Sequence, residues 1–228
     1  MEGNFYLVSK DKKTKHKIKN DMYLFYKLLT QIIPNNNTRI FVLDKTSSEF
    51  QRDLELFIDI LTNEENITFV SKILCMGKTS SACLKNSEIK SLLLEHTSGK
   101  IIIRAFLCAN IENDMIYLRT ICGVGGGGIL LENLKKMVTD KQIKVKGIYL
   151  HSVKSQETQK FYNKQGFRPK KEFVEQVLDK QEKMKKSLVN IPVHMKYTIL
   201  GINPILYWFP DKYDETFYPN NDWDKIII

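Results

Sequence analysis

The sequence predicts an α/β (α+β) fold in which an antiparallel meander of strands is followed by a parallel βαβ crossover. Apolar strand patterns at 92–95, 101–109 and 115–122 are separated by short polar turns, as in a meander. A helical pattern from Ile129 then precedes another strand pattern at 145–153. A crossover of this length joins parallel strands, so the central sheet is expected to be mixed.

The composition is that of a folded globular chain. The 228 residues are 43% hydrophobic and 27% charged, which excludes collagen, coiled coil and wholesale disorder. We expect an N-terminal α/β extension over residues 1–66, within the same domain or beside it. A core over 67–200 and an aromatic, acidic tail over 201–228 would follow.

The extension is predicted to be helix, strand, helix. Periodic apolar residues indicate helices over 21–33 and 47–61, and the first ends before a proline. Between them, residues 39–44 have the pattern of a short buried strand. Residues 10–19 form a basic run without apolar period, which we interpret as a solvated loop, with a nucleic-acid patch as the alternative.

The rest of the chain completes the alternation of strands and helices. Residues 67–75 indicate a strand, and 87–97 could be a helix, although a hairpin turning at 97–99 fits better. A second turn is expected at 112–114. After the crossover, the predicted elements are a helix over 155–165 closed by a glycine, a charged helix over 175–187 and a last strand over 193–200.

The charge is basic, with a formal net charge of +9 and a pI of about 9.2. Such a balance favours an anionic partner, for example nucleic acid or a phosphate-rich cofactor. Only five of the 35 basic residues are Arg, the residue whose planar guanidinium best forms paired hydrogen bonds with phosphates. A lysine-rich composition without functional meaning therefore stays an alternative.

Cysteines and hydropathy indicate the compartment. Cys75, Cys83, Cys108 and Cys122 form no C-x-x-C pair, so we expect reduced thiols and no metal site. We expect neither a signal peptide nor a membrane segment, and no membrane partner. The expected location is cytoplasmic or nuclear.

A glycine run is the feature of the sequence that most clearly indicates a binding site. Gly123 and Gly125 to Gly128 lie directly after a predicted strand and open a predicted helix. Glycines let the backbone turn sharply and approach a ligand, and the first N–H groups of a helix attract phosphate. A flexible linker or a tight packing corner is the alternative.

Two common phosphate loops fit poorly. A P-loop needs a glycine five residues before Gly77-Lys78-Thr79, where the chain has Lys72. The Rossmann pattern G-x-G-x-x-G is present from Gly123 to Gly128. The next strand, however, ends in His151-Ser152-Val153-Lys154 and offers no acidic residue for a ribose.

A third pattern explains both halves of this region. The stretch Gly125 to Glu132, GGGGILLE, resembles the G-x-G-x-x-L-L-E stretch of the GNAT family of N-acetyltransferases. The stretch Phe161 to Phe167, FYNKQGF, resembles the family's second motif, (L/F)-Y-x-x-x-G-F, at the expected separation. The resemblance covers about residues 91–167 and implies a GNAT-like sheet with acetyl-CoA as the cofactor.

The resemblance also implies roles for individual residues. The glycine loop would hold the pyrophosphate of coenzyme A through backbone N–H groups, and the preceding strand would pair with the pantetheine arm. Tyr162 would protonate the leaving thiolate, a role that suits a hydroxyl donor. The cofactor-binding residues implied are Leu118, Thr120, Ile121, Cys122, Gly123, Val124, Gly125, Gly126, Gly127 and Gly128.

The chain departs from the family at the general base. Strand 115–122 lacks the glutamate that often deprotonates the amine, so His151 on the neighbouring strand is the best candidate base. Its alternative role is purely structural. Glu112 and Asp114, at the meander turn, are expected to be solvated.

The predicted activity is direct acetyl transfer from acetyl-CoA to the primary amine of a small molecule or protein. The rival function is a non-catalytic binding module of the same fold, which uses its basic surface for nucleic acid or a protein partner. The aromatic tail could cap an acceptor groove, but a strap packed over the sheet is the favoured interpretation.

Overall fold

A computed structural model describes residues 5–8, 15–17, 37–43, 83, 86–97, 100–123, 125–153, 155–184, 203–219 and 222–226. The chain divides into two compact units. The first comprises residues 1–111 and 118–137, and the second comprises residues 112–117 and 138–228. Over the described residues, the longest apolar helices are too short or too polar to span a membrane.

The meander predicted in the middle of the chain is present. Strands β4 (Ile89–Thr97) and β5 (Lys100–Glu112) pair antiparallel, in a register from Ile89↔Ala109 to Thr97↔Lys100. The predicted hairpin is therefore confirmed, and the alternative helix over 87–97 is wrong. Both strands contain continuous buried stretches, over residues 91–94 of β4 and 105–109 of β5.

The second turn joins β5 to its neighbour β6 (Met115–Gly123). Asn113 and Asp114 have φ values of 50° and 59°. Two consecutive residues with positive φ are typical of a type I′ turn, whose twist matches that of the flanking strands. Asn and Asp tolerate this conformation better than other non-glycine residues.

Three strands near the N-terminus extend the sheet. Strand β3 (Asn37–Leu43) pairs antiparallel with β4, which confirms the strand predicted at 39–44. Strand β1 (Phe5–Val8) pairs parallel with β5, and β2 (Lys15–Lys17) pairs antiparallel with β1.

The prediction of a solvated loop over residues 10–19 is therefore wrong for 15–17. A strand at a sheet edge is held by backbone hydrogen bonds, and lysines are common on such edges. The absence of an apolar period thus does not exclude a strand there.

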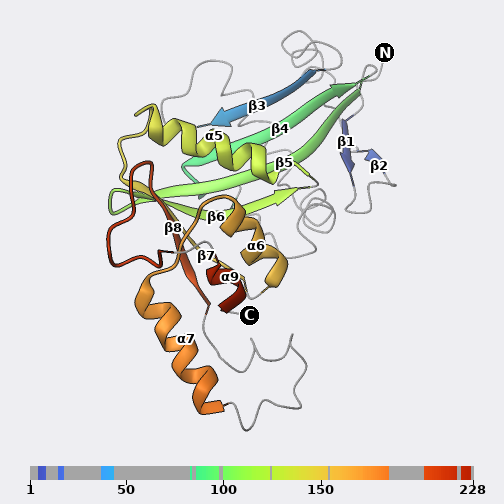
Figure 1. Cartoon of the computed structure of the whole chain (residues 1–228). Helices are drawn as coiled ribbons and strands as arrows, with labels where there is room; N and C mark the ends of the chain where they lie inside the picture. The colour runs from blue at the N-terminus through green and yellow to red at the C-terminus, as the bar shows by residue number, and fades with distance from the viewer. Residues whose placement is uncertain are drawn as a thin grey trace. The chain divides into compact units, whose positions relative to one another are not determined.

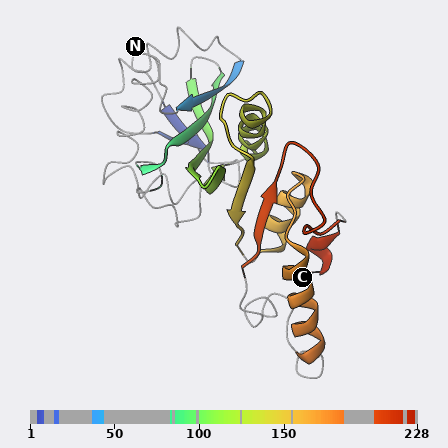
Figure 2. The same ribbon diagram turned by 90° about the vertical axis from the view of Figure 1, so that its left-hand side faces the viewer.

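Helix α5 (Gly127–Thr139) covers one face of the sheet formed by β3, β4 and β5 (Figures 1 and 2). Its buried side chains recur at the spacing of one helix face, and these are Leu130, Leu131, Leu134, Met137 and Val138. The helix predicted from Ile129 is confirmed, and it begins at the end of the glycine run.

The crossover leads to β7 (Gly147–His151), which pairs parallel with β6 from Met115↔Gly147 to Tyr117↔Tyr149. The predicted parallel pair is confirmed, and the chain has a mixed sheet. Ile148 and Leu150 are buried, whereas Tyr149 and His151 point to the other face. This alternation follows from the two-residue period of a strand.

The second unit also contains α6 (Gln156–Lys164), α7 (Lys171–Met184), β8 (Ile205–Trp208) and α9 (Trp223–Ile226). The two predicted helices are confirmed, although α7 begins four residues earlier than expected. Gly166, at φ 75°, ends α6 as predicted. Helices α6, α7 and α9 lie together beside β8 (Figure 2).

The C-terminal segment is part of the core of this unit. Strand β8 pairs antiparallel with β7, so the aromatic segment contributes a strand that the sequence did not predict. Prolines and polar residues flank a four-residue strand that is too short to show a period. Trp223 is fully buried, and its Nε1 donates to the Phe167 carbonyl at 3.0 Å.

Several predictions fall outside the described residues. They are the helices over 21–33 and 47–61, the strands over 67–75 and 193–200, and the position of Val124. The division at residues 66 and 200 stays a prediction.

Candidate functional site

The glycine run lies where β6 ends and α5 begins, as the sequence predicts. Gly125 has φ 79°, in the left-handed region that favours glycine, and no atom lies within 4 Å of the position of an added Cβ. The backbone turns here from strand to helix, and Gly125 is exposed. This residue is therefore glycine because of backbone conformation, with open space beside it.

Two other glycines permit close packing. A Cβ on Gly123 would stand 2.3 Å from the Cβ of Ala105 and 2.6 Å from the Arg104 carbonyl. A Cβ on Gly126 would stand 2.5 Å from Leu93 Cδ2. The packing-corner interpretation therefore accounts for both positions, which explains part of the run without a ligand.

The remaining glycines, Gly127 and Gly128, form the first turn of α5. The first hydrogen bond of the helix runs from the Leu130 N–H to the Gly126 carbonyl, at 3.2 Å. The N–H groups before Leu130 consequently have no acceptor within the helix. No acidic residue lies in this first turn, so nothing in the helix opposes an anion at its positive end. The residues fit a phosphate group.

The strand before the loop has an incomplete ladder with β7. The pairs between β6 and β7 end at Tyr117↔Tyr149, whereas β6 continues to Gly123. The predicted pantetheine-pairing residues lie in this continuation. Leu118 is buried, and the Thr120 hydroxyl donates to Cys83 Sγ at 3.6 Å. Ile121 is half-buried.

The cysteines differ from the prediction of four reduced thiols. Cys122 is disulfide-bonded, so the prediction is wrong at this position. Cys83 and Cys108 are thiols. Spacing in sequence gives no indication of which cysteines meet in the fold, because a disulfide needs only that two Cα atoms come close. Burial raises the pKa of Cys108 to about 12 and makes it an unreactive core residue.

Tyr162 lies in α6 and is buried, with its ring against Phe161 at 5.1 Å and Phe167 at 5.6 Å between centroids. Phe161 is half-buried, and Tyr162 is the more deeply buried of these two neighbours. Burial raises the pKa of Tyr162 well above its ordinary value. The hydroxyl therefore keeps its proton at neutral pH.

His151 is exposed at the end of β7 and belongs to a cluster of rings. Its ring makes edge contacts with Tyr117 and Tyr149, at centroid distances of 5.7 and 6.4 Å. Tyr117 and Tyr149 stack on each other at 5.0 Å, because the register of β6 and β7 places them side by side. The predicted base thus stands among aromatic side chains.

Glu112 makes a contact that the sequence did not predict. The Tyr149 hydroxyl donates to Glu112 Oε2 at 2.7 Å, and Glu112 is half-buried. The expectation of a solvated Glu112 is therefore wrong. The same expectation is correct for Asp114, whose side chain is 74% exposed. Its Oδ2 atom lies 3.6 Å from Nζ of Lys146, which is about as exposed.

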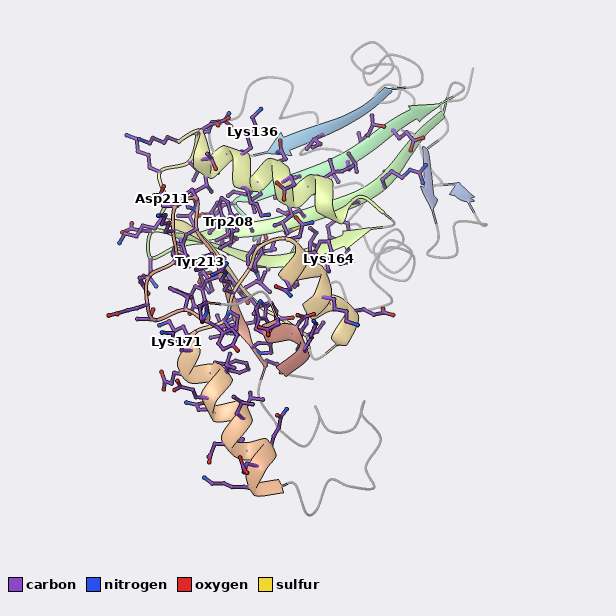
Figure 3. All side chains as sticks on the ribbon, in the orientation of Figure 1. Lys136, Lys164, Lys171, Trp208, Asp211 and Tyr213 are labelled. Carbon is purple, nitrogen blue, oxygen red and sulfur yellow. The ribbon has the colours of Figure 1, made fainter. Side chains whose placement is uncertain are left out.

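The aromatic segment after β7 adds a second group of rings. Tyr207 lies level with Tyr149 on β8 and stacks on it at 6.2 Å. Phe209, Tyr213 and Phe217 contact one another beyond it. Figure 3 shows Trp208 and Tyr213 within this crowded region, and Asp211 on the outside of the loop. The favoured packing interpretation holds for Phe217, which is buried.

The predicted site residues fall in both units. The residues from Leu118 to Gly128 belong to the first unit, whereas His151, Tyr162 and Glu112 belong to the second. Within the second unit, the structure brings His151 together with Glu112 through Tyr149. Over the described residues, no three His, Cys, Asp or Glu side chains are grouped so as to hold a metal ion.

No protein-family model matches the chain, and no curated protein matches it. Among solved structures, the chain is similar to N-acetylglutamate synthase from Neisseria gonorrhoeae, which was determined with coenzyme A and N-acetyl-glutamate. The identity is 11% and the TM-score 0.36, over 76% of this chain and 36% of the synthase chain. Since this likeness is too distant to support an activity, we base the proposed function on the residues of this chain.

Proposed function

We propose that the protein is an acetyl-CoA-dependent N-acetyltransferase that transfers an acetyl group to a primary amine. The observation that carries the proposal is the strand-to-helix turn at Gly125, followed by two glycines in the first turn of α5. Packing explains Gly123 and Gly126, whereas Gly127 and Gly128 lie in the first turn of α5. An alanine at either position would favour the helix, so their retention supports a ligand that approaches the backbone.

The pyrophosphate of coenzyme A would be held by backbone N–H groups within the stretch from Cys122 to Gly128. The pantetheine arm would pair with the part of β6 that continues beyond its ladder with β7. Extended ligands add to sheet edges in this way, because backbone groups supply the hydrogen bonds. The residues concerned are Leu118, Thr120, Ile121 and Cys122.

When bound, acetyl-CoA would supply an activated acetyl group as a thioester. Tyr162 would donate a proton to the leaving sulfur, because a phenol carries its proton at neutral pH; burial raises its pKa and makes it a weaker acid. A backbone N–H of β6 would polarise the thioester carbonyl. The chain would otherwise act mainly by holding the amine close to the carbonyl carbon.

The acceptor amine must be neutral to attack. His151 is the proposed proton acceptor, because an exposed imidazole at the end of β7 can exchange its proton with solvent. The acceptor itself would be an amine-bearing small molecule or protein. We place the reaction in the cytoplasm or nucleus.

A second candidate function is a non-catalytic module that binds nucleic acid or a protein through its basic surface. The net charge of +9 favours it. The arrangement of the aromatic side chains in the second unit argues against the stacking of nucleic-acid bases on them. Tyr117, Tyr149 and Tyr207 stack face to face with one another and so present their edges, whereas base binding uses ring faces.

A turnover assay separates the two functions. Purified protein is incubated with acetyl-CoA and a panel of primary amines, and released coenzyme A thiol is measured. An enzyme should release thiol only with an amine present. Absence of amine-dependent release, together with salt-dependent binding of single-stranded nucleic acid, would favour the module.

A further inference from the structure

The half-buried face of the second unit carries an unusual combination of a carboxylate and aromatic rings. Tyr117, Tyr149 and Tyr207 form one row across β6, β7 and β8, because the registers of the three strands bring them level. His151 lies two residues beyond Tyr149 on the same face. Glu112 stands beside the row, bonded to Tyr149. All five side chains are at least partly accessible to solvent.

Packing of the rings alone would require neither a hydroxyl at position 149 nor a carboxylate at position 112. A phenylalanine at position 149 would stack on both neighbours equally well, and a neutral residue at 112 would avoid partial burial of a charge. The hydroxyl of Tyr149 instead fixes the position of Glu112 by binding its Oε2 atom at 2.7 Å. A carboxylate accepts several hydrogen bonds, so Glu112 can receive a further donor while Tyr149 holds it.

The charges near this carboxylate favour a cationic group. The ion pair between Lys146 and Asp114 is exposed at the turn and is neutral as a pair. Lys170 lies at the other end of the row, 5.8 Å from the Tyr207 ring centre. A ligand with one cationic group would therefore place that group at Glu112, away from Lys170.

The rings indicate what is attached to the cation. Because the tyrosines stack face to face, a ligand meets their edges, and a ring approaching edge-on prefers to present its face. His151 already contacts Tyr117 and Tyr149 in this T-shaped manner, at interplanar angles of 80° and 64°. An aromatic group on the ligand can pack in the same way.

We propose that Glu112 and Tyr149, with Tyr117 and His151 beside them, bind the acceptor as an arylalkyl primary amine. The ammonium group binds the Glu112 carboxylate, and the aromatic group packs against the edges of the tyrosine row. The inference rests on the proposed acetyltransferase function, for which it names the substrate class and the residues that select it. Tyr149 acts as a positioning residue for Glu112.

Direct binding tests the site without turnover. Isothermal titration calorimetry of the full chain uses phenethylamine as the probe and phenethyl alcohol as its neutral analogue. Glu112→Gln should weaken phenethylamine binding at least about tenfold, because a hydrogen bond to a charged group is lost. Asp114→Asn, which removes a carboxylate from the same turn, should leave binding within about twofold since exposed pairs contribute little.

The tyrosines supply a second pair of variants. Tyr149→Phe keeps the stacked ring but releases Glu112, so it should weaken phenethylamine binding by several-fold. Tyr218→Phe removes a hydroxyl outside the row, keeps the carboxylate anchored and should have little effect. Phenethyl alcohol should bind weakly and equally to all variants, because it has no charge for Glu112 to recognise.

The outcomes are distinguishable from those for the proposed function. Failure of phenethylamine to bind the wild-type protein, or equal affinity in Glu112→Gln, would overturn the inference. Should acetyl-CoA fail to bind while phenethylamine still binds through Glu112, the amine site stands and the acetyltransferase function falls.

Discussion

A β-carbon at position 123 would lie only 2.3 Å from the β-carbon of Ala105, so β6 and β5 are in contact at this point. Gly123→Ala should therefore destabilise the protein by about 1–3 kcal/mol, since the backbone must shift to relieve the clash. Urea denaturation measures this loss. The matched control is Gly128→Ala, in the first turn of α5, which should be neutral or stabilising by up to about 1 kcal/mol. Equal losses in both variants would contradict the distinction between packing and ligand-facing glycines.

The buried indole of Trp223 should be a main anchor of the C-terminal segment. Trp223→Ala removes a fully buried ring and should cost about 3–5 kcal/mol in urea denaturation. Trp223→Phe keeps most of the packing but leaves the Phe167 carbonyl without its donor, so about 1–3 kcal/mol should be lost. Lys225→Ala, on the exposed side of α9, should change stability by less than about 0.5 kcal/mol. A stable Trp223→Ala variant would mean that the segment does not belong to the core.

The bond between Tyr149 and Glu112 should make stability depend on alkaline pH. Burial, then the hydrogen bond to Glu112, raises the pKa of Tyr149 from 10 to about 12. The neutral phenol is favoured in the folded state, so its contribution is complete below about pH 10 and is lost as the pH rises towards 12. The stability advantage of wild type over Tyr149→Phe should shrink over that interval and stay constant between pH 7 and 9. An advantage that grows above pH 10 would contradict the assigned direction.

Tyr162 should contribute to chemistry more than to cofactor binding. Tyr162→Phe keeps the ring packed against Phe167 but removes the proton donor, so kcat should fall about 10²-fold with little change in acetyl-CoA affinity. Stopped-flow release of coenzyme A thiol, with chemistry rate-limiting, measures this step. Phe161→Leu, at the half-buried neighbour, is the control and should leave kcat within about threefold. An unchanged kcat in Tyr162→Phe would make Tyr162 a packing residue.

Local patterns predicted most of the described fold. The apolar runs of β6 and β7 predicted both strands, and the turn residues predicted the hairpin between β4 and β5. The glycine run was placed correctly between a strand and a helix. Each of these depends on neighbours in sequence, which is why one sequence sufficed.

Contacts between distant residues were not predictable in the same way. Glu112 was expected to be solvated because it precedes a turn, and only the register of β6 and β7 brings Tyr149 next to it. Strand β2 has no apolar period in its sequence, and the backbone hydrogen bonds of a strand pair do not require one. The disulfide at Cys122 likewise depends on long-range proximity, which cysteine spacing does not encode.

The most direct test of the proposed function is isothermal titration of the purified chain with acetyl-CoA. Wild type should bind, and a ligand at about 100 times its Kd should add about 2.7 kcal/mol of stability. Gly127→Leu, which places a side chain at the first turn of α5, should abolish binding in a folded protein. Ile129→Ala, at an exposed position of the same helix, should bind within about twofold of wild type. No heat of binding with wild type, or undiminished binding by Gly127→Leu, would contradict the assignment of this loop to acetyl-CoA.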